Sequence, residues 1–320
     1  MTKNTEPGVK KKFKWFNLIR LAGIVLFVVI LARTDLGELW GWLKIVNLWW
    51  VGGAFLFQLL LLLIKCFRWL WMNESGFERK KIYQRSGEFL EAYAMGAITP
   101  GRLGEIMKAG HSKGRSNVVS SVLLVISERG LDLSLFFLMA GISLSLGYLP
   151  AMTPTFGYTL TLVAVIGIIM AFSILLFPAV VRMIDIILKK IKLIASEQSL
   201  VFVHRNGKSI AIFTVLSVLS NLCSFLSFYC IALAVMINLG FMPVSGSVAL
   251  AGIINSIPVT IMGIGTRDVT LLYVMSEIPK AQILAFSGLI LLISQVGGGI
   301  IAMLSGQFFL YKAKKLKIED

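Results

Sequence analysis

Apolar runs long enough to cross a lipid bilayer recur along this sequence, and they limit its fold more than any other feature. Six of them approach or exceed the ~20 residues that a spanning helix needs. Hydrocarbon offers no partner to a free backbone amide, so runs of this kind must be helical. We therefore expect an all-α polytopic membrane protein with about six spanning helices, in a single integral membrane domain over residues 1–320. The runs are Phe16–Ala32, Leu48–Met72, Val118–Leu146, Tyr158–Pro178, Ile210–Ile237 and Ile283–Tyr311.

The composition supports this class and explains the strong positive charge. Hydrophobic residues make up 57% of the chain and charged residues 15%, whereas a soluble domain carries about 25% charged residues. The net charge of +15 would indicate a nucleic-acid partner in a soluble protein. Here the basic residues gather at the ends of the apolar runs, as the positive-inside rule predicts. Attraction to anionic lipid headgroups is a compatible interpretation, and we expect no nucleic-acid partner.

The basic segments also predict how the chain is oriented in the membrane. A basic head (residues 1–15), basic loops after the second and fourth runs, and a basic tail (residues 312–320) belong on the cytoplasmic side. The loop over residues 147–157 has no Lys or Arg and belongs outside. Both termini are therefore expected to be cytoplasmic.

Two remaining segments, residues 86–115 and 246–280, fit no single crossing, because both ends of each lie on the same predicted side. Each is interrupted by residues that stop a helix, followed by an arginine and an acid. Backbone broken at membrane depth is tolerated only inside the protein or beside a water-filled cavity. We expect two re-entrant helical hairpins related by an inverted repeat, with a binding site at their breaks. Pro and Gly also occur in membrane helices without such a role. The residues concerned are Pro100, Gly101, Arg102, Gly104 and Glu105 in the first segment, and Pro258, Gly263, Gly265, Arg267 and Asp268 in the second.

The third apolar run contains three charged residues, Glu128, Arg129 and Asp132. Each ionised residue at a helix centre costs ~2.5–3.5 kcal/mol on insertion scales, so these side chains must face protein or water. Glu128 and Asp132 lie four residues apart and share a helix face, and Arg129 can reach Asp132. One interpretation is a self-neutralising structural ion cluster. The other is that Arg129 binds an anionic group that the two acids help to position.

These residues define a candidate site for a phosphate-bearing headgroup. Arginine pairs with phosphate through two parallel hydrogen bonds. Lys65, Arg68 and Lys108 are interpreted as flank charges that reach the inner headgroups. No hydrolase, nucleotide-binding or zinc-protease motif is present, and the three cysteines have no metal spacing, so we expect no enzyme, cofactor or metal. The headgroup-binding candidates are Arg102, Arg129 and Arg267, and the residues that balance charge or couple protons are Glu105, Glu128, Asp132 and Asp268.

In these three places the sequence resembles the transmembrane, flippase-like region of lysylphosphatidylglycerol synthases, also called multiple peptide resistance factors. Pro100 through Glu105 follows the family pattern P-x-R-x-G-E, and Glu128 through Asp132 follows E-R-x-x-D. Pro258 through Asp268 is similar to P-x-G-G-x-G-x-x-E, with Met262 in place of a Gly and Asp268 in place of Glu.

The resemblance implies that the chain moves an anionic phospholipid, such as an aminoacylated phosphatidylglycerol, or a lipid-linked substrate between leaflets of a prokaryotic plasma (inner) membrane. In the family, aminoacyl transfer belongs to a separate soluble domain after this region, so we expect a stand-alone form without it. One alternative is a membrane subunit that anchors or regulates a separate lipid-modifying enzyme. Another is a membrane-embedded transferase that uses Glu128 and Asp132 as acid and base.

Overall fold

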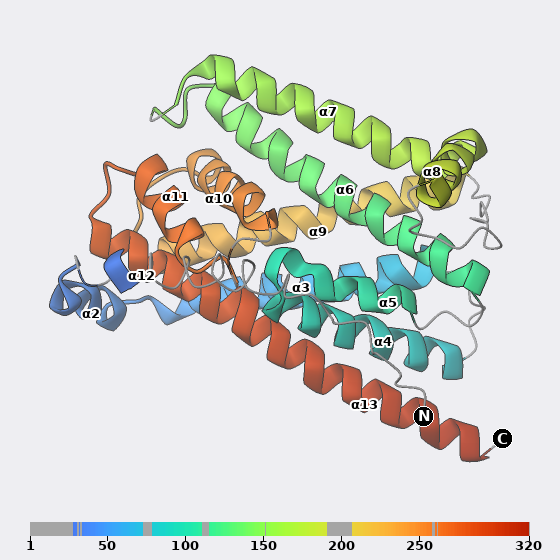
Figure 1. Ribbon diagram of the computed structural model, residues 1–320. Coiled ribbons are helices and arrows are strands. Elements are labelled where there is room, and N and C mark those ends of the chain that lie inside the picture. The colour runs from blue at the N-terminus through green and yellow to red at the C-terminus, as the bar shows by residue number, and fades with distance from the viewer. Residues whose placement is uncertain are drawn as a thin grey trace, which may run out of the picture.

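The computed structural model describes residues 28–30, 32, 34–72, 79–110, 115–150, 152–190, 207–257, 260 and 262–319. These residues form long helices that run roughly along one common direction, with shorter helices at the ends and in the middle (Figure 1). The basic head and Pro258 lie outside the described residues, as does nearly all of the first expected span. The helices are α2 (Leu36–Lys44), α3 (Leu48–Met72), α4 (Arg79–Ile98), η1 (Pro100–Ile106), α5 (Met107–Gly110), α6 (Arg115–Ser145), α7 (Pro154–Leu176), α8 (Pro178–Lys190), α9 (Gly207–Ala234), α10 (Phe241–Ser256), α11 (Thr266–Val274), α12 (Lys280–Ile290), η2 (Leu291–Gly297) and α13 (Gly298–Glu319).

The expected polytopic all-α class is confirmed. Four described helices are long and apolar enough to cross a membrane: Leu48–Met72, Pro154–Leu176, Gly207–Ala234 and the continuous Lys280–Leu316. Each coincides with one of the predicted apolar runs. The helix α6 has 31 residues, which exceeds the length of a span, although its centre carries Glu128, Arg129 and Asp132.

The first predicted break is a tight helical hairpin. After α4 the chain turns through Gly101 and Arg102, whose φ angles are 60° and 55°. The Thr99 hydroxyl accepts a hydrogen bond from the backbone N–H of Gly104 at 2.8 Å, which holds η1 against the end of α4. A Cβ on Gly104 would lie 2.6 Å from the backbone carbonyl carbon and oxygen of Met95. The hairpin therefore closes only with glycine at position 104.

The second predicted break lies between α10 and α11. Met262, Gly263 and Gly265 have φ angles of 56°, 73° and 87°, so the chain reverses through left-handed backbone. The Asp268 carboxylate accepts a hydrogen bond from the backbone N–H of Gly265 at 2.8 Å, which caps the start of α11. The helix α11 then packs back against α10, so this segment is also a hairpin.

The two halves of the chain pack against each other in a reciprocal way. The helices that precede the hairpins, α3 and α9, lie side by side. The helix after the first hairpin, α6, packs on α10 of the second, and the helix after the second hairpin, α13, packs on α4 of the first (Figure 1). The tip η1 also contacts α10. An inverted repeat predicts this exchange of partners.

Basic side chains gather at one end of the bundle. This is the end in Figure 1 where α8 and the carboxyl end of α13 lie, whereas α2 and the start of α12 lie at the opposite end. The arrangement agrees with the positive-inside rule, and the assignment of this end to the cytoplasm stays a prediction. The described basic residues at this end include Arg182, Lys189, Lys190, Lys208, Lys312, Lys314 and Lys315.

Candidate functional site

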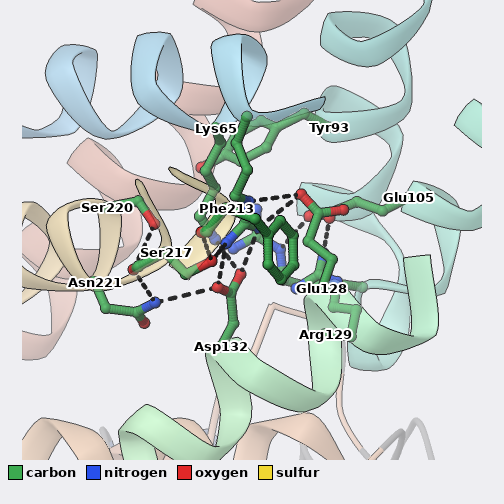
Figure 2. Close-up of polar contacts among 12 residues, drawn as sticks. Lys65, Tyr93, Glu105, Glu128, Arg129, Asp132, Phe213, Ser217, Ser220 and Asn221 are labelled. Carbon is green, nitrogen blue, oxygen red and sulfur yellow. Dashed lines mark hydrogen bonds and ion pairs between the residues drawn. The ribbon is translucent and has the colours of Figure 1, made fainter. Parts of the chain in front are cut away.

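The two acids of α6 converge on one arginine of α3. Nη1 of Arg68 donates to Asp132 Oδ1 at 2.7 Å, and Nη2 donates to Glu128 Oε1 at 2.6 Å. The three side chains are buried, with Arg68 only 1% exposed. Glu128 and Asp132 do share one helix face, as their spacing predicts, and they point into the same network in Figure 2.

Neighbouring helices supply further partners to the two carboxylates. Lys65 Nζ lies 2.8 Å from Asp132 Oδ2, and Lys108 of α5 pairs with Glu128. From α9, Asn221 donates to Asp132 at 3.1 Å, and Ser217 accepts from Arg68 at 2.7 Å. Buried ions are tolerated when their hydrogen-bonding capacity is filled in this way.

Aromatic rings cover the cations of this network. The Arg68 guanidinium lies 5.4 Å from the centroid of Phe213. The Lys108 ammonium lies 4.6 Å from the ring of Trp69 and 5.2 Å from that of Phe89. These distances are within the range of cation–π attraction. The rings also belong to an apolar cluster to which α3, α4, α6, α7 and α9 contribute, so the charges sit inside a packed core.

The interpretation of Arg68 and Lys108 as flank charges is wrong. Their side chains are each 1% exposed and contact carboxylates of α6 instead of reaching toward a membrane surface. Lys65 is also largely enclosed, at 13% exposure. The physical reason is lateral packing: α6 and α9 cover this face of α3, and the hairpin brings Lys108 back into the protein interior.

The first hairpin adds a pair of arginines that share one acid. Arg129 pairs with Glu105 of η1, and Arg102 Nε lies 3.0 Å from Glu105 Oε1. The expectation that Arg129 would reach Asp132 is not what the contacts show, because the folded-back hairpin offers Glu105 instead. The side chains of Arg102 and Arg129 are 31% and 30% exposed, whereas that of Glu105 is 8% exposed.

Both of these arginines keep hydrogen-bonding capacity. Nε of Arg102 and Nη2 of Arg129 are buried atoms that lie near Glu105 without the alignment of a hydrogen bond. The guanidinium of Arg102 lies over the ring of Tyr93, 4.7 Å from its centroid. The Tyr93 hydroxyl accepts from Gln58 Nε2 at 3.2 Å. We call Arg102, Arg129 and Glu105 the arginine pair and its acid.

Taken together, five cations and three carboxylates meet in the described part of this network, which leaves two positive charges in excess. The charges therefore do not balance within this network, although Arg68 bridges Glu128 and Asp132 at its core. The arginine pair has one carboxylate for two guanidinium groups, and arginine stays charged in proteins. The members are Lys65, Arg68, Arg102, Lys108 and Arg129, with Glu105, Glu128 and Asp132.

The remaining predicted residues, Arg267 and Asp268, form a second cluster at the other hairpin. Arg267 Nε donates to the Ser287 hydroxyl at 2.7 Å, and Ser287 donates to Asp268. Arg267 and Asp268 are 4% and 2% exposed. The contacts of Arg267 are thus with α12 and with its neighbour in α11, and they do not join it to the arginine pair.

The two clusters are built in a similar way. Each hairpin has an acid after its break, and the helix that follows the hairpin contacts that acid: Arg129 of α6 contacts Glu105, and Ser287 of α12 contacts Asp268. An inverted repeat would predict this similarity. The two clusters also show an asymmetry, since a cation in the first half is replaced by a hydroxyl in the second.

Sequence reasoning missed the contributions of α9. Polar residues recur at three- and four-residue spacing along this otherwise apolar helix, so they lie on one helix face. This spacing in the sequence predicts a polar face that is turned toward the protein interior. No group of three His, Cys, Asp or Glu that could hold a metal occurs within the residues described. The polar residues are Ser217, Ser220, Asn221 and Ser224.

Comparison with known families gives a match over most of the chain. The family profile described as the lysylphosphatidylglycerol synthase TM region matches residues 17–302, a range that includes both hairpins and the whole charged network. A search of curated proteins finds no significant match. The chain is a membrane protein related to lipid handling, and it belongs to the lysylphosphatidylglycerol synthase transmembrane-region family.

Proposed function

We propose that the chain moves a lipid with a phosphate-bearing headgroup between the leaflets, and that Arg102 and Arg129 bind the phosphate. One observation carries the proposal: two partly exposed arginines share one acid beside a buried ion network. Planar guanidinium groups bind phosphate oxygens in pairs. Membership of a lipid-related family supports the same substrate class.

In this proposal Glu105 is the residue that a phosphate replaces. The carboxylate of Glu105 occupies the position between the two arginines when no headgroup is bound. An incoming phosphate competes for the same donors, and Glu105 regains them when the headgroup leaves. The acyl chains stay in lipid while the two repeats move around the site, as in other transporters built from inverted repeats.

The core acids have a different part in the proposal. Glu128 and Asp132 are each held by Arg68 and by a lysine, so they anchor α6 to α3 and fix the position of Arg129. A transferase would need one of them as a free acid or base. Their engagement with cations supports a role in positioning instead. Arg267 and Asp268 would anchor α11 to α12 in the same way in the second half.

Leaflet exchange in proteoliposomes tests this function. Fluorescent phospholipids are placed in both leaflets, and the fraction open to a membrane-impermeant quencher is followed over time. We expect the purified protein to exchange lipids, and Arg129→Gln and Arg102→Gln each to slow exchange by about 10- to 100-fold, the range for hydrogen bonds to charged groups. Lys280→Gln is the matched control, because Lys280 is exposed at the start of α12.

Two results would contradict the proposal. If both arginine variants fold and exchange lipid at the wild-type rate, the arginine pair is not the headgroup site. If no lipid moves in any preparation, the role as a membrane subunit of a lipid-modifying enzyme becomes the better candidate. A stoichiometric partner that purifies with the chain would then support that role.

A further inference from the structure

We infer that α8 lies in the membrane surface at the basic end of the bundle, where it binds anionic phospholipids. Its apolar side chains would rest among the upper parts of the acyl chains, and its basic side chains would bind the headgroups. The helix covers Pro178–Lys190 and comes directly after the spanning helix α7. This surface lies on the outside of the bundle, so its assignment does not depend on the proposed function.

The helix α8 is too short and too charged to cross the membrane. Its 13 residues extend about 20 Å at 1.5 Å per residue, whereas the hydrocarbon core is about 30 Å thick. Four of these residues are charged, and α8 is not among the described helices that could span a membrane. The helix must therefore lie either in the membrane surface or in water.

A sharp corner separates α8 from α7. Phe177, between the two helices, has extended backbone with φ −112° and ψ 112°. Pro178 then begins α8 and has no N–H with which to continue the hydrogen bonds of α7. In Figure 1, α7 runs across the view, whereas α8 is strongly foreshortened at its end, so the two helix axes lie at a large angle. A helix that turns away from a spanning helix in this way runs along the membrane surface.

The apolar side chains of α8 lie on two sides of the helix. Val181 is buried at 2% exposure and faces the protein. Met183, Ile186 and Ile187 recur at three- and four-residue spacing and are 63%, 64% and 50% exposed. We call these three residues the apolar stripe of α8. The stripe points away from the protein, and in water it would leave large apolar surfaces uncovered.

The polar side chains of α8 lie on a separate side. Arg182, Asp185 and Lys189 also recur at three- and four-residue spacing. The Lys189 ammonium lies 2.8 Å from the Asp185 carboxylate, and Arg182 is exposed. A short helix with one apolar and one basic face lies in the plane of a membrane surface, with the apolar face at the boundary between headgroups and acyl chains.

The charge of α8 indicates which lipid it binds. Its three basic residues outnumber its one acid, and it lies at the end of the bundle where the lysines of the carboxyl end of α13 also gather (Figure 1). Anionic headgroups compensate such a positive surface. A second copy of the chain would bring the same positive charge to the apolar stripe and would be repelled. The charge therefore favours an anionic lipid surface over contact between two copies.

Quenching of a fluorophore by spin-labelled lipids tests the position of α8. In the full chain the three cysteines are replaced by alanine, and a single cysteine in place of Ile186 or Arg182 carries the fluorophore. Nitroxide groups at different places along the acyl chain report its depth. We expect the label at position 186 to lie about 5–10 Å into the headgroup and acyl boundary, and the label at position 182 to be open to an aqueous quencher. A reference label in place of Ile166, exposed within α7, should lie deeper than both.

The same label at position 186 measures the preference for anionic lipid. Vesicles contain equal parts of phosphatidylcholine and phosphatidylglycerol, with the nitroxide on one or the other. A basic residue near an anionic surface contributes up to about fivefold in affinity, so we expect spin-labelled phosphatidylglycerol to be enriched at least about twofold near α8. Arg182→Gln combined with Lys190→Gln should remove this enrichment. Lys44→Gln combined with Lys280→Gln makes the same change of charge at exposed positions near the opposite end and should keep it.

Three results would overturn the inference. A label at position 186 that is as open to water as the label at position 182 would place α8 outside the membrane. Equal quenching by the two lipids would remove the preference for anionic headgroups. Energy transfer between labels at position 186 on different copies, above the level for random mixing, would make the stripe a contact between copies. None of these results depends on whether lipid moves between leaflets, so the proposed function is tested separately.

A second labelling scheme keeps the test available if the cysteine-free chain does not fold. Cys230 is buried, and Cys66 and Cys223 are only partly exposed. An added cysteine at the exposed position 186 should therefore react first in the wild-type background. The chain without an added cysteine, labelled under the same conditions, gives the background signal to subtract.

Discussion

Asp132 and Arg68 link α6 to α3 inside the protein, with Oδ1 of the acid 2.7 Å from Nη1 of the arginine. Arg68 is enclosed on all sides, by Glu128, Ser217 and the ring of Phe213 as well as by Asp132. Three helices, α3, α6 and α9, thus meet at one guanidinium group.

Removal of Arg68 should therefore destabilise the whole fold. Arg68→Met leaves two buried carboxylates short of a partner, and breaking a buried ion pair costs about 3–5 kcal/mol. We expect a clear fall in the unfolding temperature of the protein in detergent, whereas Lys280→Met should show little change. An unfolding temperature equal to wild type for Arg68→Met alone would show that the network does not hold the helices together.

Glu105→Gln should strengthen the binding of anionic headgroups. The glutamine keeps the shape of the side chain but no longer competes as an anion for Arg102 and Arg129. We expect short-chain phosphatidylglycerol to stabilise this variant more than it stabilises wild type in a thermal shift titration. Exchange between leaflets should become slower, because the headgroup leaves the arginines less readily. Weaker binding in a folded variant would argue against competition between Glu105 and the phosphate.

Tyr93 should position Arg102 through its ring and not through its hydroxyl. Cation–π contacts contribute about 0.5–2 kcal/mol, so Tyr93→Leu should lower the affinity for an anionic headgroup by roughly 2- to 30-fold. Tyr93→Phe keeps the ring, loses the hydroxyl that accepts from Gln58, and should stay close to wild type. A short-chain lipid titration compares the two variants. Equal losses in both would assign the effect to the hydroxyl.

The first hairpin should be intolerant of any side chain at position 104. Gly104→Ala would place a Cβ 2.6 Å from the Met95 carbonyl group and 2.8 Å from the Gly96 nitrogen, all of them backbone atoms that cannot rotate away. We expect a loss of folded, monodisperse protein on size-exclusion chromatography. Gly110→Ala is the matched control, since a Cβ added there would meet no atom within 4 Å. Normal behaviour of Gly104→Ala would mean that η1 does not pack on α4 as described.

Removal of the Ser287 hydroxyl should lower the stability of the protein. The hydroxyl accepts from Arg267 and donates to Asp268, and its removal leaves both charged groups short of a partner at a cost of about 1–3 kcal/mol. We expect Ser287→Ala to lower the unfolding temperature. Ser256→Ala removes an exposed hydroxyl that bonds only within its own helix, and it should have little effect. A similarly small change of unfolding temperature in both variants would show that the contacts of Ser287 with Arg267 and Asp268 do not stabilise the fold.

Local sequence patterns predicted the features that depend on one segment at a time. Apolar length located the spans at Leu48–Met72 and Gly207–Ala234. Pro and Gly located the two breaks, and the four-residue spacing of Glu128 and Asp132 placed both acids on one face. Each of these follows from helix geometry or backbone conformation, which neighbouring helices modify little.

The partners of the charged residues could not be predicted in the same way. Whether Arg68 reaches a membrane surface or the interior depends on which helices cover it laterally, and a position near the end of an apolar run carries no information about that. The same is true of Lys108, which a reversal of the chain carries inward. Arg129 could have paired with Asp132 of its own helix, but in the structure it pairs with Glu105 of the first hairpin.

The exchange of partners between the two halves has a consequence for how the protein is made. The helix α4 is covered by α13, which lies in the other half of the chain and is synthesised much later. Until then one side of a polar, charge-bearing hairpin faces lipid, the insertion machinery or a chaperone. The ion network is likewise incomplete until α9 is inserted, because Ser217 and Asn221 of α9 bind Arg68 and Asp132. The first half must therefore stay in the membrane without these contacts until the helices of the second half have been inserted.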